Sequence, residues 1–203
     1  MSVSATPDLL ALDRAAQDLL FRAARTANTF TDEPVTDAQV EAIHDLIRYG
    51  PTAFNGQPLR VLLLRSAPAR ERLLPYLSSG NRAKTASAPL VAVLAADVDF
   101  HDRLPELYPH RPQARDWLTD REARAEQARF NATLQIGYLL VGVRAAGLAA
   151  GPMAGFDAAG VTREFFPDGR YETLLLMNVG HPGPDAWRDR LPRLSTSEVV
   201  RTL

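Results

Sequence analysis

Two side-chain amides stand close together in a short segment of small residues, Pro51-Thr-Ala-Phe-Asn55-Gly-Gln57-Pro58. Asn55 and Gln57 could hydrogen-bond the edge of a flat polar ring, because each amide carries both donors and an acceptor. Thr52 and the alanine after it are small enough to let such a ring approach. The same residue types also form ordinary turns, so the segment by itself indicates a connection between a helix and a strand.

Basic side chains stand at two places that are far apart in the sequence. Arg25, Thr26 and Asn28 follow a helical stretch and offer a cation, a hydroxyl and an amide, which suit a phosphate or a polyol. Arg190 and Arg193 belong to a stretch with three arginines within six residues, which could clamp a phosphate. The alternatives are a helix C-terminus whose arginine complements the helix dipole, favoured for the first group taken alone, and a solvated tail for the second.

A third stretch could contribute backbone groups to a site. Glycine and other small residues let a ligand come close to backbone N–H groups. The alternative is a plain loop that ends in Asp157 as a helix N-cap. The stretch follows a long apolar run, carries no large polar side chain and includes Pro152, Met153, Ala154 and Gly155.

One cofactor would use all of these groups. Flavin mononucleotide (FMN) has a phosphate for arginines, a ribityl chain for hydroxyl and amide groups, and a pyrimidine-like ring edge for side-chain amides. Its reduced ring holds negative charge near N1, which nearby amides and cations stabilise, and it exchanges a hydride at N5. A backbone donor that faces N5 would leave room for a substrate. The four stretches together therefore predict an FMN site.

Other site chemistries lack their signatures. The chain has no Gly-x-Gly-x-x-Gly, Walker A or Gly-x-Ser-x-Gly motif and no cysteine. Its four histidines show no metal-ligand spacing, so we expect no metal site. With 23 basic and 24 acidic side chains the formal net charge is −1, which gives no reason to expect a nucleic acid or a membrane surface as partner. The lack of cysteine and of a signal-peptide pattern favours the cytoplasm.

The elements that must position these groups mix helices and strands. Residues 97–118, rich in Pro, Asp and Arg, predict an excursion or lid rather than core. The 203 residues show no linker or repeat, and 46 % hydrophobic content suffices for one core, so we predict one α+β domain over residues 1–203, with a central sheet flanked by helices. Apolar periodicity and capping patterns, with capping boxes at Thr36 and Thr119, predict helices over 7–24, 36–49, 66–77, 119–146 and 157–166 and strands over 60–65, 90–96 and 173–179.

The functional stretches occur in a fixed order, as Arg25-Thr26-x-Asn28, Pro51-Thr-Ala-x-Asn55-x-Gln57-Pro58, Gly147-Leu148-x-x-Gly151-Pro152-Met-x-Gly155-Phe-Asp157 and Arg190-x-x-Arg193. In this order and spacing, over nearly the whole chain, they resemble the nitroreductase superfamily. The resemblance is closest to the short branch that contains the malonic semialdehyde reductase of pyrimidine degradation. That branch has stretches similar to Ser78–Pro89 and Arg103–His110.

The resemblance implies a homodimer with a mostly antiparallel sheet and with FMN bound where the subunits meet. The helix that becomes apolar nearly all round from Phe130 suits a long buried interface helix. Ala24 and Asn28 stand where family members often have basic residues, so phosphate binding should lean on the C-terminal arginines. Ala154 replaces a Glu of the better-known nitroaromatic reductases. The residues implied to contact FMN are Arg25, Thr26, Asn28, Thr52, Asn55, Gln57, Asn131, Pro152, Met153, Ala154, Gly155, Arg190 and Arg193.

The activity implied by the resemblance is ping-pong hydride transfer, with NADH or NADPH as co-substrate. The acceptor would be a small carbonyl compound such as malonic semialdehyde, which gives 3-hydroxypropionate. The first alternative is a broad reductase of nitroaromatic compounds, quinones or enones. The second is a flavin-binding protein without catalysis.

Overall fold

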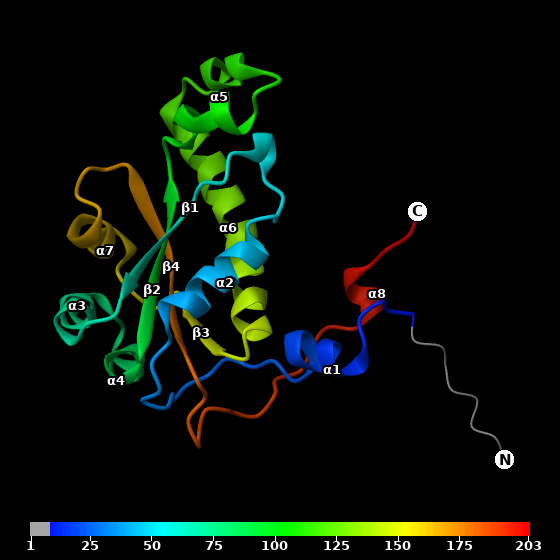
Figure 1. Cartoon of the computed structure of the whole chain (residues 1–203), viewed down its shortest axis with the longest axis vertical. Helices are drawn as coiled ribbons and strands as arrows, with labels where there is room; N and C mark the ends of the chain where they lie inside the picture. Colours follow the sequence, from blue (N-terminus) through cyan, green and yellow to red (C-terminus); the bar gives the residue numbers. More distant parts are fainter. Residues whose placement is uncertain (1–8) are drawn as a thin grey trace.

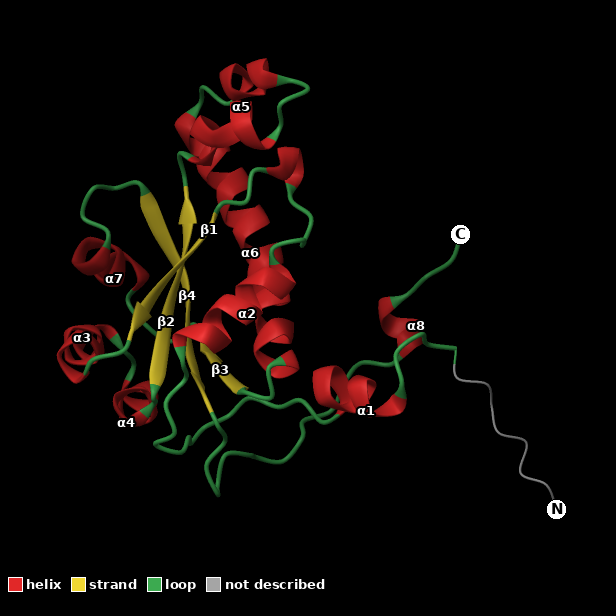
Figure 2. Ribbon diagram, viewed as in Figure 1, coloured by secondary structure: helices red, strands yellow, loops and turns green. Residues whose placement is uncertain are grey.

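The central element of the fold is an antiparallel sheet of four strands with helices on both faces, shown in Figure 1 and Figure 2. The computed structural model describes residues 9–203. Within them the strand order is β1-β2-β4-β3, and every neighbouring pair is antiparallel. The strands are β1 (Leu59–Leu64), β2 (Leu90–Asp97), β3 (Ala149–Met153) and β4 (Tyr171–Gly180).

Two layers of helices cover the sheet, as Figure 2 shows. On one face lie α2 (Asp37–Ile47) and α6 (Arg121–Ala145). On the other lie α3 (Ala67–Leu73), α4 (Ser79–Ser87) and α7 (Ala158–Phe165). The remaining helices are α1 (Arg14–Gln17), which continues as a π-helical turn over Asp18–Arg22, α5 (Leu104–Leu107) and α8 (Thr196–Val199).

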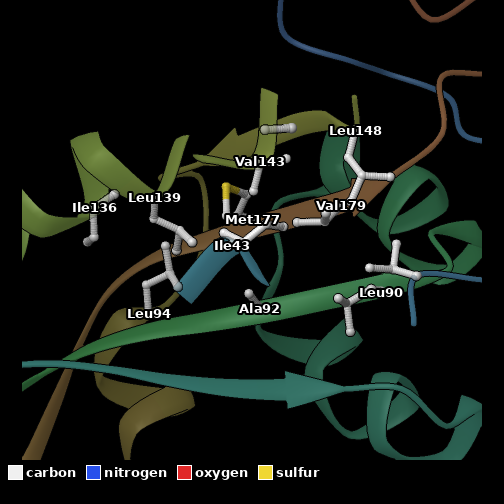
Figure 3. Packing of buried hydrophobic residues seen from close by; sticks show 12 residues of the cluster. Ile43, Leu90, Ala92, Leu94, Ile136, Leu139, Val143, Leu148, Met177 and Val179 are labelled. Carbon is white, nitrogen blue, oxygen red and sulfur yellow. The ribbon is translucent and has the colours of Figure 1, made fainter. Parts of the chain in front are cut away.

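Burial follows the alternation of side chains along the strands. Every residue of the central strand β2 is buried, which explains its continuous apolar sequence. Its even-numbered residues pack against α2 and α6 around Ile43, Leu139 and Met177, as Figure 3 shows. Its odd-numbered residues Val91 and Val93 pack against the helices of the opposite layer. The sheet therefore separates two apolar cores.

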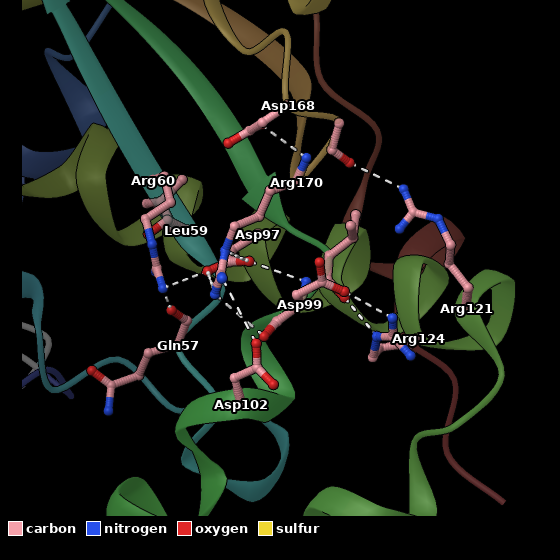
Figure 4. A network of polar contacts seen from close by, with 12 residues as sticks. Gln57, Leu59, Arg60, Asp97, Asp99, Asp102, Arg121, Arg124, Asp168 and Arg170 are labelled. Carbon is pink, nitrogen blue, oxygen red and sulfur yellow. Dashed lines mark hydrogen bonds and ion pairs between the residues drawn. The ribbon is translucent and has the colours of Figure 1, made fainter.

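A network of ion pairs ties residues 97–118 to the end of the sheet (Figure 4). Asp97 is 1 % exposed and accepts hydrogen bonds from Arg60 at 2.8 Å and from Arg170 at 3.0 Å. Arg124 of α6 donates to Asp99 at 2.8 Å. Because a buried carboxylate needs paired donors, Asp97 fixes the point at which the chain leaves β2.

Most predicted elements are present, and three details of the predictions are wrong. The strand β3 forms where a loop was predicted, because its backbone pairs with β4 although Gly151 and Pro152 favour strands poorly. The helix α6 is capped by Asp120, whose Oδ1 accepts from Ala123 N at 2.7 Å, and not by Thr119.

The third correction concerns the first helix. The first helix begins at Arg14, directly after its N-cap residue Asp13. Leu9 is therefore outside the helix, and its side chain is exposed instead of packed. The proposed start at Thr6-Pro7 lies outside the described residues. Residues 97–118, predicted as an excursion or lid, enclose a small core of their own in which Phe100 and Leu104 are fully buried.

Candidate functional site

The amide segment, residues 51–58, has an unusual backbone. Phe54, Asn55 and Gln57 have φ angles of 55°, 53° and 45°, in the left-handed region that few non-glycine residues adopt. A buried side chain of α6 holds this conformation: Asn131 Oδ1 accepts from Ala53 N at 2.7 Å, and its Nδ2 donates to Gln127 O at 2.9 Å. The segment is therefore clamped in a strained shape, which is typical of functional loops.

The side-chain amides of this segment bind other parts of the same chain. Asn55 Nδ2 donates to Leu107 O at 2.9 Å, and Gln57 Nε2 donates to Asn55 Oδ1 at 3.0 Å. Phe54 packs edge-on against Tyr108, with ring centroids 5.7 Å apart. The amide segment and α5 thus form one unit, and the second Nδ2 hydrogen of Asn55 has no partner among the described residues.

Arg25 and the arginines of residues 188–193 line a common surface hollow of about 290 Å³, which we call the cationic hollow. The C-terminal segment is held there by Arg190, which donates to the backbone oxygens of Arg22 and Ala24. Among the described residues, none of the hollow's arginines has a carboxylate partner within ion-pair distance. The cationic hollow is lined by residues 24–26, Asn28 and residues 188–191, with Arg193.

Residues 151–157 lie next to residues 25–28, and the contact runs through β3. Ala27 N donates to Ala150 O at 3.0 Å, and a Cβ on Gly151 would lie 2.8 Å from Ala27 O. Glycine at this position therefore allows the two backbones to meet. At the end of β3, Gly155 O accepts from Ser78 N, while the Gly155 N–H has no partner among the described residues.

The predicted site residues 152–155 differ in whether their side chains face the core or the solvent. Met153 is buried, with its sulfur 3.7 Å from Thr85 Oγ1, so its side chain faces the core and only its backbone can meet a ligand. Pro152 is partly exposed, and Ala154 and Gly155 are exposed. The backbone of 154–155 is thus the accessible part of this stretch.

Helix α4 places two residues beside the predicted site that sequence reasoning did not assign to it. Asn81 Nδ2 donates to Gly155 O at 3.0 Å. Lys84 lies near Arg188 of the cationic hollow, and burial together with that positive charge lowers the pKa of the Lys84 ammonium. The Ser-Ser-Gly-Asn-x-x-Lys-Thr pattern was the available signal, because it places the amide and the ammonium on one helix face.

The predicted site residues fall into two groups within one chain. The cationic hollow lies where residues 25–28 run beside the C-terminal segment, near α1 in Figure 1. The amide segment lies beside α5, towards the opposite end of α6. The structure brings three of the four stretches together and leaves the amide segment apart from them.

Large apolar side chains remain exposed along one stripe of α6. Phe130, Leu134 and Tyr138 are 66 %, 43 % and 46 % exposed and stand one helical turn apart. The C-terminal residues Leu194 and Val199 are also mostly exposed. Exposed apolar side chains clustered on one helix face are typical of an interaction surface.

Within residues 9–203, no helix has the length and apolar character needed to cross a membrane. The model of the nitroreductase family matches residues 21–181. A protein of Streptomyces griseus with the inferred name NADH dehydrogenase/NAD(P)H nitroreductase is 61 % identical over 195 residues, covering 96 % of this chain and 99 % of that protein. A similarly named protein of Leptothrix cholodnii is 46 % identical, covering 95 % of this chain and 98 % of that protein.

Solved structures share the fold at low identity. An inferred nitroreductase of Exiguobacterium sibiricum in complex with FMN superposes with a TM-score of 0.80 at 19 % identity, covering 95 % of this chain and 98 % of that one. An inferred NAD(P)H:FMN oxidoreductase of Staphylococcus epidermidis gives a TM-score of 0.82 at 18 % identity, covering 97 % and 99 %. These likenesses show the nitroreductase-like fold.

Proposed function

Since this chain belongs to the nitroreductase family, we propose that it is an FMN-dependent NAD(P)H oxidoreductase that reduces a small carbonyl compound such as malonic semialdehyde. The observation that carries the proposal is the cationic hollow. Its arginines have no ionic partner among the described residues and stand beside the hydroxyl of Thr26 and the amide of Asn28. Unpaired guanidinium groups with hydroxyl and amide neighbours fit a ribityl phosphate.

The described residues fit FMN in a definite orientation. Arg25, Arg190 and Arg193 would hold the phosphate, and Lys84 would add a cation beside them. The ring would then extend along β3 towards Gly155, whose free N–H would donate to the flavin N5. Bound FMN would supply the hydride chemistry, accepting from NAD(P)H and passing to the acceptor. The exposed Ala154 would leave the space above the ring open to substrate.

We propose that the active protein is a homodimer, because each chain separates the amide segment from the cationic hollow. A second copy would bring its own Thr52, Asn55 and Gln57 to the ring or ribityl chain. The apolar stripe of Phe130, Leu134 and Tyr138 would be buried in that interface, as an exposed stripe of this size favours. Asn131 would then act indirectly, because its hydrogen bond to Ala53 N holds the backbone conformation of the amide segment.

Residues 97–118 are proposed as a lid over the acceptor. Their contact with the amide segment, through Asn55 and Leu107, supports this position. A carbonyl acceptor needs a proton as well as a hydride, and a lid would exclude bulk water from the transfer. The lack of cysteine and the use of NAD(P)H suit a cytoplasmic enzyme.

A broad reductase of nitroaromatic compounds, quinones or enones is the second candidate. A relative that carries an inferred NAD(P)H nitroreductase name, at 61 % identity over nearly the full length, favours it. Steady-state turnover with NADPH and NADH distinguishes the two candidates when malonic semialdehyde is compared with a nitrofuran and a quinone. We expect the larger kcat/KM for malonic semialdehyde. A preference for the nitrofuran by orders of magnitude would establish the second candidate instead.

Two further measurements distinguish a loss of FMN binding from a difference in the preferred acceptor. Asn55→Ala should weaken FMN binding or shift the flavin potential while the chain stays folded, as circular dichroism would report. Bound FMN that NAD(P)H fails to reduce would point to the third possibility, a flavin-binding protein without catalysis. In that case no acceptor would be reduced by the wild-type protein.

A further inference from the structure

A buried amide side chain lies on the face of the sheet that α4 covers. It belongs to Asn178 of β4, which is 1 % exposed. Its neighbours along the strand, Met177 and Val179, pack in the core on the other face, so the alternation of side chains directs Asn178 towards α4. There Asn178 Nδ2 donates to Lys84 O and to Thr85 Oγ1, both at 3.3 Å.

Helix α4 has little apolar surface that could hold it on the sheet. Within residues 79–87, Thr85 is the one buried side chain. A helix on a sheet is normally placed by an apolar stripe, which α4 lacks, so its position depends on polar contacts. Lys84 O is among the last four carbonyls of the helix, which have no N–H partner within it, and Asn178 supplies a donor. The Ser87 hydroxyl reaches the same oxygen only at 3.4 Å.

An asparagine at this buried position has a cost. Asn178 Oδ1 is buried and has no hydrogen-bond partner among the described residues, which destabilises the fold. A leucine would occupy a similar volume without that cost, so packing alone does not explain the residue type. The two hydrogen bonds to α4 are what a leucine could not supply.

Two side chains of α4 lie beside the predicted cofactor site. Asn81 Nδ2 donates to Gly155 O at 3.0 Å, at the end of β3. Lys84 lies near Arg188 of the cationic hollow, where burial and that positive charge lower the pKa of its ammonium. Repulsion between the two cations opposes this placement, so Lys84 needs an anchor that holds it there.

We propose that Asn178 is a positioning residue, which anchors α4 through Lys84 O and Thr85 Oγ1 and so holds the Lys84 ammonium at the cationic hollow. The inference rests on the proposed function, because it takes the FMN phosphate as the ligand of that ammonium. The anchoring of α4 does not depend on a ligand and is measurable in the apo protein.

Hydrogen exchange of the backbone amides of residues 79–87 tests the anchor in the full-length apo protein. Asn178→Leu should speed exchange in α4 about tenfold and leave α6 unchanged. Thr173→Val is a matched control, because Thr173 is also a buried polar residue of β4, but its hydroxyl accepts from Thr162 of α7 at 3.0 Å. That variant should leave α4 unchanged.

Equal exchange of α4 in wild type and in Asn178→Leu would overturn the proposal. Should Asn178→Leu not fold, Thr85→Val replaces it in this test and in the FMN titrations, since it removes one acceptor of Asn178 at nearly constant shape. The same results would then support or overturn the proposal.

A double-mutant cycle on FMN affinity distinguishes the positioning of Lys84 from a general loss of structure. In a fluorescence titration, Asn178→Leu should weaken FMN binding about tenfold, and Thr173→Val by less than about twofold. In a Lys84→Met background, Asn178→Leu should cost less than about twofold further, because the ammonium that it positions is already absent.

A tenfold loss in both backgrounds would overturn the proposal, and so would wild-type FMN affinity in Asn178→Leu. Wild-type protein that binds no FMN would instead refute the proposed function, and with it the role of Lys84 at the phosphate. Hydrogen exchange would in that case still decide whether Asn178 anchors α4.

Discussion

Asn131 is the side chain whose removal should reveal most about the amide segment. It is 4 % exposed and makes two hydrogen bonds, one from Ala53 N at 2.7 Å and one to Gln127 O at 2.9 Å. Asn131→Ala would leave the Ala53 N–H without its acceptor. It would also release a segment with three positive φ angles.

The expected loss follows from these two bonds. An unsatisfied backbone N–H costs about 1–3 kcal/mol. Gln127 O also accepts within the helix, so losing the second bond costs about 0.5–1.5 kcal/mol. Together, about 3 kcal/mol of the free energy of unfolding should be lost, which for a domain of this size lowers Tm by about 6–12 °C.

Urea unfolding at fixed protein concentration measures this loss, since association would otherwise change the apparent stability. Thr133→Ala is a matched control on the same helix: its hydroxyl donates to Arg129 O at 2.8 Å, but in an exposed place. That variant should stay within about 0.5 kcal/mol of wild type. If Asn131→Ala were as stable as Thr133→Ala, the segment would hold its shape without the buried amide, and our reasoning would be wrong.

Three further predictions concern the cofactor site and the dimer. Arg190→Ala should weaken FMN binding about tenfold to a hundredfold in a fluorescence titration, whereas Arg163→Ala on α7 should have no effect; equal affinities would exclude the cationic hollow as the phosphate site. Because the pKa of Lys84 is lowered, its charge is lost earlier as pH rises, so FMN affinity should fall on the alkaline side in wild type and hold in Lys84→Arg; identical pH profiles would contradict this. Leu134→Asp should convert a dimer to a monomer in light scattering, and an unchanged mass would place the interface elsewhere.

Local sequence signals account for much of the fold. The capping box at Thr36 is present, with Thr36 Oγ1 accepting from Gln39 N and the Gln39 side chain accepting from Thr36 N. The uninterrupted apolar run of β2 predicted a fully buried strand. Such signals depend on neighbouring residues, so a single sequence suffices to find them.

The strand β3 shows what local signals miss. Its five residues include Gly151 and Pro152, which indicate a loop by themselves. The strand forms because Ala150 and Gly151 pair with β4, whose residues 171–180 lie well after β3 in the sequence. Its edge position also tolerates the missing N–H of Pro152. Long-range pairing of this kind has no counterpart in the local pattern.

The candidate site was partly accessible from the sequence. The chemical match of Arg25 with Arg190 and Arg193 predicted that these distant stretches serve one ligand, and the structure places them around one hollow. The proposed role of Lys84 was not predicted, because its position beside Arg188 depends on how α4 packs. The separation of the amide segment from the hollow depends on the tertiary fold and could not be predicted locally.

The most direct test of the account is an anaerobic absorbance titration of the purified protein with FMN and then with NAD(P)H. The account predicts one FMN bound per chain, with a perturbed visible spectrum that NAD(P)H bleaches and a small carbonyl acceptor restores. A protein that takes up no FMN would contradict the assignment of the cationic hollow. Bound FMN that neither NADH nor NADPH reduces would contradict the proposed oxidoreductase activity.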